Sequence, residues 1–289
     1  MTETEQYTFD LNGYLVIPQL LATDETASLA KAAEVLTEHA EDHLEDPPRV
    51  TALRGVAYHR DEELGYHVSC NWRSGDDTAK QVNGRSLLIE DFFNANSAFD
   101  CLVNHARTQP YVTALISERP AINNSELRVR YPGNLSGTHM GGPLGAKYRY
   151  RFYDGRMDCM MIRVIYFLHD VSTDQGAFCV VPGTHKSNFA SPYHCAPHEE
   201  PNMVPLEVKA GDAILFTENL RHGGVPNLSE QVRKTLHVGY GPYWLKSQNI
   251  ATMDQDPYIL EQTLERYDDA QKHLFHTYEL PKRVLTRAR

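Results

Sequence analysis

Short apolar and alternating runs dominate the second half of the chain. From about residue 127 they follow one another as LRVRY, DCMMIRVIYFL, AFCVVP, NMVPLEV, DAILF and KTLHVGY. Segments rich in Gly, Asn, Asp and Pro separate them, such as YPGNLSG, TDQGA, KAGD and GGVPNLSEQ. Apolar runs of this length between turn residues are typical of β-strands, and a series of them predicts a jelly roll or barrel.

The first half of the chain has a different pattern. The run LNGYLVIP predicts a short strand that proline closes, and apolar residues then recur at helical spacing over residues 29–40. Thr23 or Asp24 can cap the N-terminus of that helix. The segment 86–115 is expected to be mostly helical. The whole pattern predicts a mainly β protein, a jelly roll buttressed by N-terminal helices.

A single domain is expected over residues 1–289. The sequence contains no internal repeat, low-complexity tract or linker that would separate two cores. Within this domain we expect a helix-rich part at 1–125, a jelly-roll core at 126–245 and a C-terminal helical extension at 246–289.

Charge and composition narrow the range of partners. The chain has 38 Asp and Glu against 28 Lys and Arg, a formal net charge of -10, which disfavours nucleic acid and anionic membranes as partners. Its five cysteines show no CxxC pair, and the N-terminus has no apolar signal segment. We therefore expect a soluble cytoplasmic protein with a small-molecule partner, and the sequence does not indicate its oligomeric state.

Two of the 14 histidines stand out by position. His139 follows the turn-rich segment YPGNLSGT, and His222 follows a predicted buried strand within DAILFTENLRHGGVPN. Each lies next to a predicted strand, and this position would place both histidines at the open end of a barrel. They form a candidate metal pair if the sheet folds back, although ordinary structural histidines explain the same pattern.

Arg233 and Thr235 lie on one face of the predicted strand RKTLHVGY, because side chains alternate along a strand. A guanidinium beside a hydroxyl suits a carboxylate ligand. A surface arginine next to a threonine is the simpler explanation when the pair is taken alone.

Taken together, these segments resemble the phytanoyl-CoA dioxygenase-like (PhyH) family of non-haem Fe(II)/2-oxoglutarate enzymes. LNGYLVIPQLL is similar to the N-terminal strand and helix entry of that family, GAFCVVPGTHKSNF to its PGSH segment, and KAGDAILFTENLRHGGVPN with the following Arg233 to its distal-histidine motif. The resemblance implies a double-stranded β-helix, which is the cupin-like form of the jelly roll.

The resemblance also implies roles for the candidate residues. His139 and His222 would bind Fe(II), and Arg233 with Thr235 would bind the far carboxylate of 2-oxoglutarate, with O2 as the oxidant. The family motif places a carboxylate two residues after the first histidine to complete a facial triad. This chain has Gly141 there.

Gly141 allows three interpretations. An open coordination position would admit chloride, as in related non-haem halogenases, and the reaction would be radical halogenation. Alternatively, Glu218, Asp154, Asp158 or water would replace the missing ligand in a hydroxylase. In the third interpretation the pocket is a metal-poor, non-oxidative binding module. Arg233 and Thr235 speak against the third interpretation, because a pocket without chemistry does not need a 2-oxoglutarate clamp. Halogenation is our leading expectation.

The substrate pocket has further candidates. Arg163 is the charged residue in the most apolar run, so it is expected to pair with an anionic ligand in the pocket or with an internal carboxylate. The basic and aromatic segment GPLGAKYRYRFYDGRMD, with Tyr148 and Tyr150, is interpreted either as a lid over the site or as an ordinary hairpin. Both features are compatible with a carboxylate- or phosphate-bearing substrate.

Overall fold

The computed structural model describes residues 1–289 except 53–54, 73–83, 142–147, 247–248, 250–258 and 276–289. The N-terminal part contains α1 (Glu3–Asn12), β1 (Tyr14–Ile17), α2 (Thr23–Asp42), β2 (Arg49–Val50), β3 (Ala57–Asp61), β4 (Tyr66–Cys70), β5 (Ser86–Glu90) and α4 (Gln109–Leu115). The strands that follow are β6 (Pro120–Arg130), β7 (Ser136–His139), β8 (Tyr150–Tyr153), β9 (Arg156–Cys159), β10 (Ile162–Phe167), β11 (Phe178–Val181), β12 (Val204–Pro205), β13 (Ala213–Thr217), β14 (Arg221–Gly224) and β15 (Arg233–Pro242).

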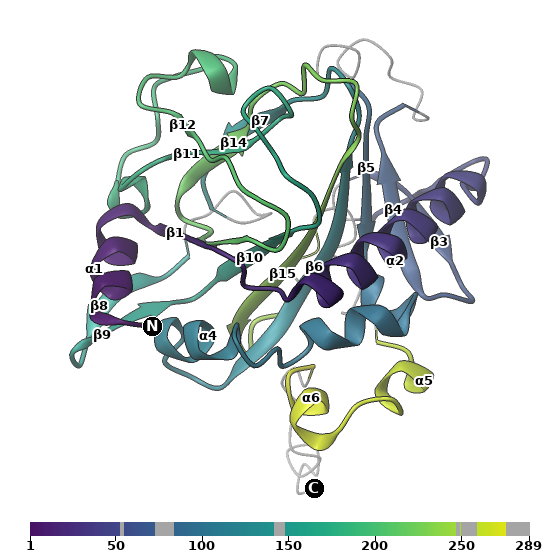
Figure 1. The fold of residues 1–289 in the computed structure, drawn as a ribbon, viewed down its shortest axis with the longest axis horizontal. Helices are drawn as coiled ribbons and strands as arrows, with labels where there is room; N and C mark the ends of the chain where they lie inside the picture. Colours follow the sequence, from purple (N-terminus) through teal and green to yellow (C-terminus); the bar gives the residue numbers. More distant parts are fainter. Residues whose placement is uncertain (53–54, 73–83, 142–147, 247–248, 250–258, 276–289) are drawn as a thin grey trace, which may run out of the picture.

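Two antiparallel sheets form the body of the protein. The large sheet has the order β1-β13-β10-β15-β6-β5-β4-β3-β2, and the small sheet has the order β12-β11-β14-β7. Strands β8 and β9 form a separate two-stranded hairpin. Figure 1 shows the small sheet next to one end of the large sheet, with β10, β15 and β6 running through the centre of the molecule. This is the jelly-roll architecture that the strand pattern predicted.

Each face of the large sheet has its own hydrophobic core. One core packs the sheet against α2, α4 and the neighbouring short helices, with Leu36, Phe92 and Val112 among its buried residues (Figure 1). The other core lies between the two sheets and includes Ile165 of β10 and Phe178 of β11. The second core supports one end of the interior, where the candidate residues gather.

The N-terminal part departs from the expected pattern in two places. Residues 3–12 form a helix whose N-cap, Thr2, accepts from the backbone N–H of Glu5 in a capping box. Ser86–Glu90, expected to be helical, is instead a strand of the large sheet, with Leu87 and Ile89 buried on its inner face. Pairing with β4 and β6 decides that conformation, since tertiary contacts commonly override local propensity in short segments.

The C-terminal extension expected at 246–289 lies partly outside the described residues. Its described part contains two short helices, α5 (Glu261–Leu264) and α6 (Asp269–His273). No helix in the described ranges combines the length and the apolar character that crossing a membrane requires.

Candidate active site

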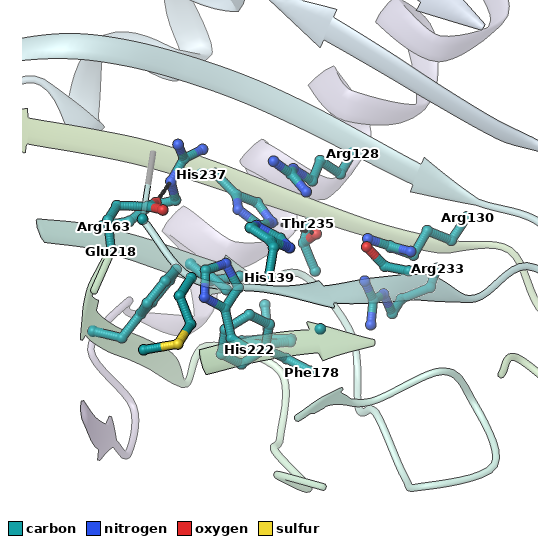
Figure 2. Close-up of a pocket in the computed structure, with 17 residues that line it drawn as sticks. Arg128, Arg130, His139, Arg163, Phe178, Glu218, His222, Arg233, Thr235 and His237 are labelled. Carbon is teal, nitrogen blue, oxygen red and sulfur yellow. Dashed lines mark hydrogen bonds and ion pairs between the residues drawn. The ribbon is translucent and has the colours of Figure 1, made fainter. Parts of the chain in front are cut away.

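His139 and His222 lie opposite each other in the small sheet. His139 ends β7, His222 is the second residue of β14, and the pairing of these strands puts the two residues directly in register. Their ring centroids are 4.1 Å apart. Both imidazoles line a cavity of about 420 Å³ whose walls come from both sheets (Figure 2).

Each of these rings is oriented through Nδ1. Nδ1 of His222 lies 2.7 Å from the carbonyl oxygen of Leu220, and Nδ1 of His139 lies 3.2 Å from that of Gly137. Desolvation by the surrounding protein atoms lowers the pKa of both imidazoles, and for His222 the neighbouring His139 adds to the effect. His222 is buried, whereas His139 keeps an exposed edge, so desolvation is the stronger cause at His222. A neutral ring that donates from Nδ1 keeps a lone pair on Nε2, which is the form that binds a metal.

Aromatic side chains support the His222 ring. The centroid of Phe216 lies 4.8 Å away in an edge-on arrangement, and that of Phe178 lies 5.4 Å away. Phe216 comes from β13 of the large sheet and Phe178 from β11 of the small sheet. His222 is therefore held from both sides of the interior.

Gly141 lines the same cavity two residues after His139. Its φ of 79° lies in the left-handed region, and its N–H donates to the carbonyl oxygen of Glu218 over 2.7 Å. Glycine brings no ligand atom to this position. In the described part of the chain, no group of three or more His, Cys, Asp or Glu side chains is arranged to hold a metal.

Arg233 and Thr235 project from the same face of β15, as their alternation along the strand predicted, and both line the cavity. Both are buried, and Nη1 of Arg233 donates to the carbonyl oxygen of Gly176. The Thr235 hydroxyl lies 3.0 Å from Nε2 of His237, which is the next residue on the same face. Burial, with a contribution from the charge of Arg128, lowers the pKa of Arg233 to about 10, so the guanidinium stays protonated at neutral pH.

Arg163 lies at the other end of the cavity and is 3 % exposed. Its Nε donates to Glu218 over 2.5 Å, and its Nη1 donates to Glu126 over 2.7 Å and to Asn124 over 2.8 Å. The side chain thus lines the cavity and forms the internal ion pair that was one of the two alternatives left open by the sequence. Figure 2 shows the Arg163–Glu218 pair beside the histidines.

The three alternative carboxylates occupy different surroundings. Glu218 lines the cavity and is paired with Arg163. Asp158 accepts hydrogen bonds from Nε of Arg149 and from Nε of Arg151, both over 2.8 Å. Asp154 lies in the turn between β8 and β9. Of the three, Glu218 is the one among the described cavity-lining residues.

The two candidate tyrosines belong to the hairpin region. The Tyr150 hydroxyl donates to Asp10 over 2.9 Å, and the backbone N–H of Tyr148 donates to the Asn219 side chain over 2.8 Å. Neither tyrosine is among the described residues that line the cavity. Part of the segment interpreted as a lid, residues 142–147, lies outside the described residues.

Comparison with known proteins identifies the family. The model for Phytanoyl-CoA dioxygenase (PhyH) matches residues 9–235 of this chain. The protein belongs to the PhyH family of Fe/2-oxoglutarate-dependent oxidoreductases. Phytanoyl-CoA dioxygenase 1 of rice (Oryza sativa subsp. japonica) is 23% identical over 257 residues, which cover 82% of this chain and 88% of the rice protein.

Solved structures with the same fold share less of the sequence. HygX from Streptomyces hygroscopicus, with nickel and 2-oxoglutarate bound, has a TM-score of 0.65 at 21% identity and covers 86% of this chain and 89% of its own. The epimerase SnoN, in complex with Fe3+, alpha ketoglutarate and nogalamycin RO, has a TM-score of 0.59 at 16% identity, with coverages of 89% and 93%. At these identities the likeness shows that the PhyH chain has their fold.

Three ionisable pocket residues of this PhyH protein were not among the sequence candidates, namely Arg128, Arg130 and His237. Alternation contained the signal for all of them. LRVRY places Arg128 and Arg130 on one face, and KTLHVGY places His237 on the face of Thr235. The sequence did not show which of the two faces of each strand forms the cavity wall.

Proposed function

We propose that this protein is an Fe(II)- and 2-oxoglutarate-dependent enzyme that breaks a C–H bond of a small molecule and replaces the hydrogen atom. In this proposal a halide ion binds beside the two histidines. The observation that carries the proposal is the pair of neutral, in-register imidazoles of His139 and His222 with Gly141 at the same cavity wall. The reaction that fits this arrangement best is radical halogenation, with chloride as the simplest halide.

The residues present suit an iron site. His139 and His222 would hold the metal through Nε2, since Nδ1 of each ring already has a carbonyl partner. Arg233 and Thr235 would bind the far carboxylate of 2-oxoglutarate. Bound iron would supply, with 2-oxoglutarate and O2, the oxidising power that removes a hydrogen atom from the substrate.

Halide suits the third position for two reasons. Gly141 has no side chain to occupy it, and the nearby carboxylate of Glu218 is committed to Arg163. In addition, four arginines, Arg128, Arg130, Arg163 and Arg233, line the cavity, while the ion pairs that these arginines form involve two carboxylates, those of Glu126 and Glu218. An excess of positive charge in a buried cavity favours binding of an anion.

Hydroxylation is the second candidate, and Glu218 is the observation that favours it. Glu218 lines the cavity, and its negative charge acts to raise the pKa of His139 against the larger effect of desolvation. If Glu218 left Arg163 it could complete a ligand set of two histidines and a carboxylate. The same oxidising chemistry would then insert oxygen instead of halogen.

The cavity volume and charge suggest the substrate class. A space of about 420 Å³ accommodates a small molecule. The surplus of guanidinium groups favours a substrate that carries a carboxylate or phosphate.

Anaerobic titration with Fe(II) and 2-oxoglutarate tests the proposal. A metal-to-ligand charge-transfer absorption should appear with the wild-type protein and should be absent with His222→Ala. Adding chloride should perturb that absorption if halide binds the metal. No absorption at any ligand concentration would favour a non-oxidative binding module, and an absorption that ignores chloride and needs Glu218 would favour the hydroxylase.

A further inference from the structure

Arg130 and Arg233 face each other across two neighbouring strands. They are directly paired residues of β6 and β15, and both side chains line the cavity. Figure 2 shows the two guanidinium groups together at one end, with Arg163 and Glu218 at the other. Two like charges have therefore been brought together in one wall of the cavity.

Both guanidinium groups have unused hydrogen-bonding capacity. Nη1 of Arg130 donates to Asn134 over 2.9 Å, and Nη1 of Arg233 donates to the Gly176 carbonyl. The Nε atom of each is buried without a hydrogen-bond partner in the structure. A guanidinium has five N–H donors, so each group can still serve a ligand.

Among the described residues, no acidic side chain balances the charges of these two arginines. Arg163 pairs with Glu126 and Glu218, and Arg128 also pairs with Glu126, whereas no carboxylate of the described residues forms an ion pair with Arg130 or Arg233. Burial and the charge of Arg233 together lower the pKa of Arg130 well below its ordinary value. A bound anion would offset both the desolvation of the guanidinium groups and the repulsion between them.

The side chain of Arg130 also lies close to the small sheet. A Cβ atom at Gly224 of β14 would lie 3.6 Å from Nη1 of Arg130. The guanidinium of Arg130 therefore reaches from the large sheet to the backbone of the small sheet. Arg233 donates to the carbonyl oxygen of Gly176, which lies in the segment before β11, so the two arginines together wall one end of the cavity.

We propose that Arg130 is a second arginine of the cosubstrate clamp, so that the far carboxylate of 2-oxoglutarate lies between Arg130 and Arg233. This inference rests on the proposed function. A carboxylate has enough lone pairs to accept from both groups at once, and bonds between charged partners are the strong ones. The protein should therefore bind a 2-oxo acid with a second carboxylate much more tightly than a 2-oxo acid without one.

Binding of two matched acids tests this assignment. 2-Oxoglutarate and 2-oxopentanoate have the same chain length, but the second has a methyl group in place of the far carboxylate. Their dissociation constants would be measured by calorimetry on Ni(II)-loaded protein for the wild type, Arg130→Met, Arg130→Lys and Arg233→Met. Arg49→Met, which removes an arginine from a surface ion pair, is the matched control.

Arg130→Met should weaken 2-oxoglutarate binding by about 10- to 100-fold, which is the loss of a hydrogen bond to a charged group, and should leave 2-oxopentanoate binding unchanged. Arg130→Lys should restore part of the preference, and Arg49→Met should keep all of it. Equal weakening of both acids, or no change in either, in an Arg130→Met or Arg130→Lys protein that melts cooperatively overturns the inference. A wild-type protein that does not prefer 2-oxoglutarate overturns the proposed function as well, whereas a preference that needs Arg233 but not Arg130 overturns the second arginine alone.

Discussion

Arg163 donates from Nε to Glu218 over 2.5 Å, and both residues are 3 % exposed. The same guanidinium also holds Glu126. Arg163→Met would leave two buried carboxylates without this partner, and breaking a buried ion pair typically costs about 3–5 kcal/mol. We therefore expect a loss of that size in the free energy of unfolding, measured by urea denaturation.

Two control variants accompany this prediction. Arg49→Met removes a surface ion pair and should cost about 1 kcal/mol or less. Arg163→Met combined with Glu218→Gln should recover part of the loss, because one uncompensated charge is removed. An Arg163→Met protein as stable as the wild type would show that the ion pair is dispensable for folding.

Substitutions at Gly141 separate the effect of its backbone conformation from the effect of its missing side chain. Its φ of 79° strains any residue with a Cβ atom, so Gly141→Ala should lose about 1–2 kcal/mol of stability and keep the response of the iron spectrum to chloride. Gly141→Asp should lose that response, because Asp tolerates the left-handed region and would occupy the position proposed for halide. Spectra of the Fe(II)·2-oxoglutarate form with and without chloride check both variants, and a chloride response that survives in Gly141→Asp would count against halide at this position.

Metal should stabilise the protein through His139 and His222. A ligand present at 100 times its dissociation constant adds about 2.7 kcal/mol to the folded state. We expect Ni(II) to raise the melting temperature of the wild type, chelation to reverse the shift, and His222→Ala to show no shift. His43→Ala replaces an exposed histidine on a helix end and should respond to Ni(II) as the wild type does.

Acid should destabilise the protein partly through His237. Burial, with the charges of nearby arginines, lowers the pKa of His237 well below its ordinary value of about 6.5. Below that pH the unfolded chain takes up a proton that the folded protein refuses, so the free energy of unfolding falls as the pH falls. His237→Gln should reduce the slope between pH 6 and 5 by about 1.4 kcal/mol per pH unit, the value for one proton. Equal slopes in urea titrations of the two proteins would contradict this assignment.

Strand alternation predicted much of the site. It placed Arg233 and Thr235 on one face of their strand, because a period of two depends on local geometry alone. It did not predict the partners of Arg163, since Glu126 and Glu218 are 37 and 55 residues away along the chain. Those contacts depend on the order in which distant strands pair.

Dependence on the pairing of distant strands also explains the other features that the sequence did not predict. Ser86–Glu90 contains residues compatible with helix, and its strand conformation follows from pairing with β6. The pairing of Arg130 with Arg233 is likewise a matter of register between two strands far apart in sequence. The position of the two proposed iron-binding histidines was indicated by the turn-rich segments before them, whereas their role as iron ligands rests on the resemblance to the family.

The proposed metal site and the proposed clamp belong to different sheets. His139 and His222 lie in the small sheet, whereas Arg130, Arg233 and Thr235 lie in the large one. A cosubstrate bound at both ends would act as a cross-link, and its length would set the spacing between the sheets. With metal alone bound, the packing of the core would still set the distance between the sheets. The active-site cavity would therefore become fully rigid only when the cosubstrate is bound.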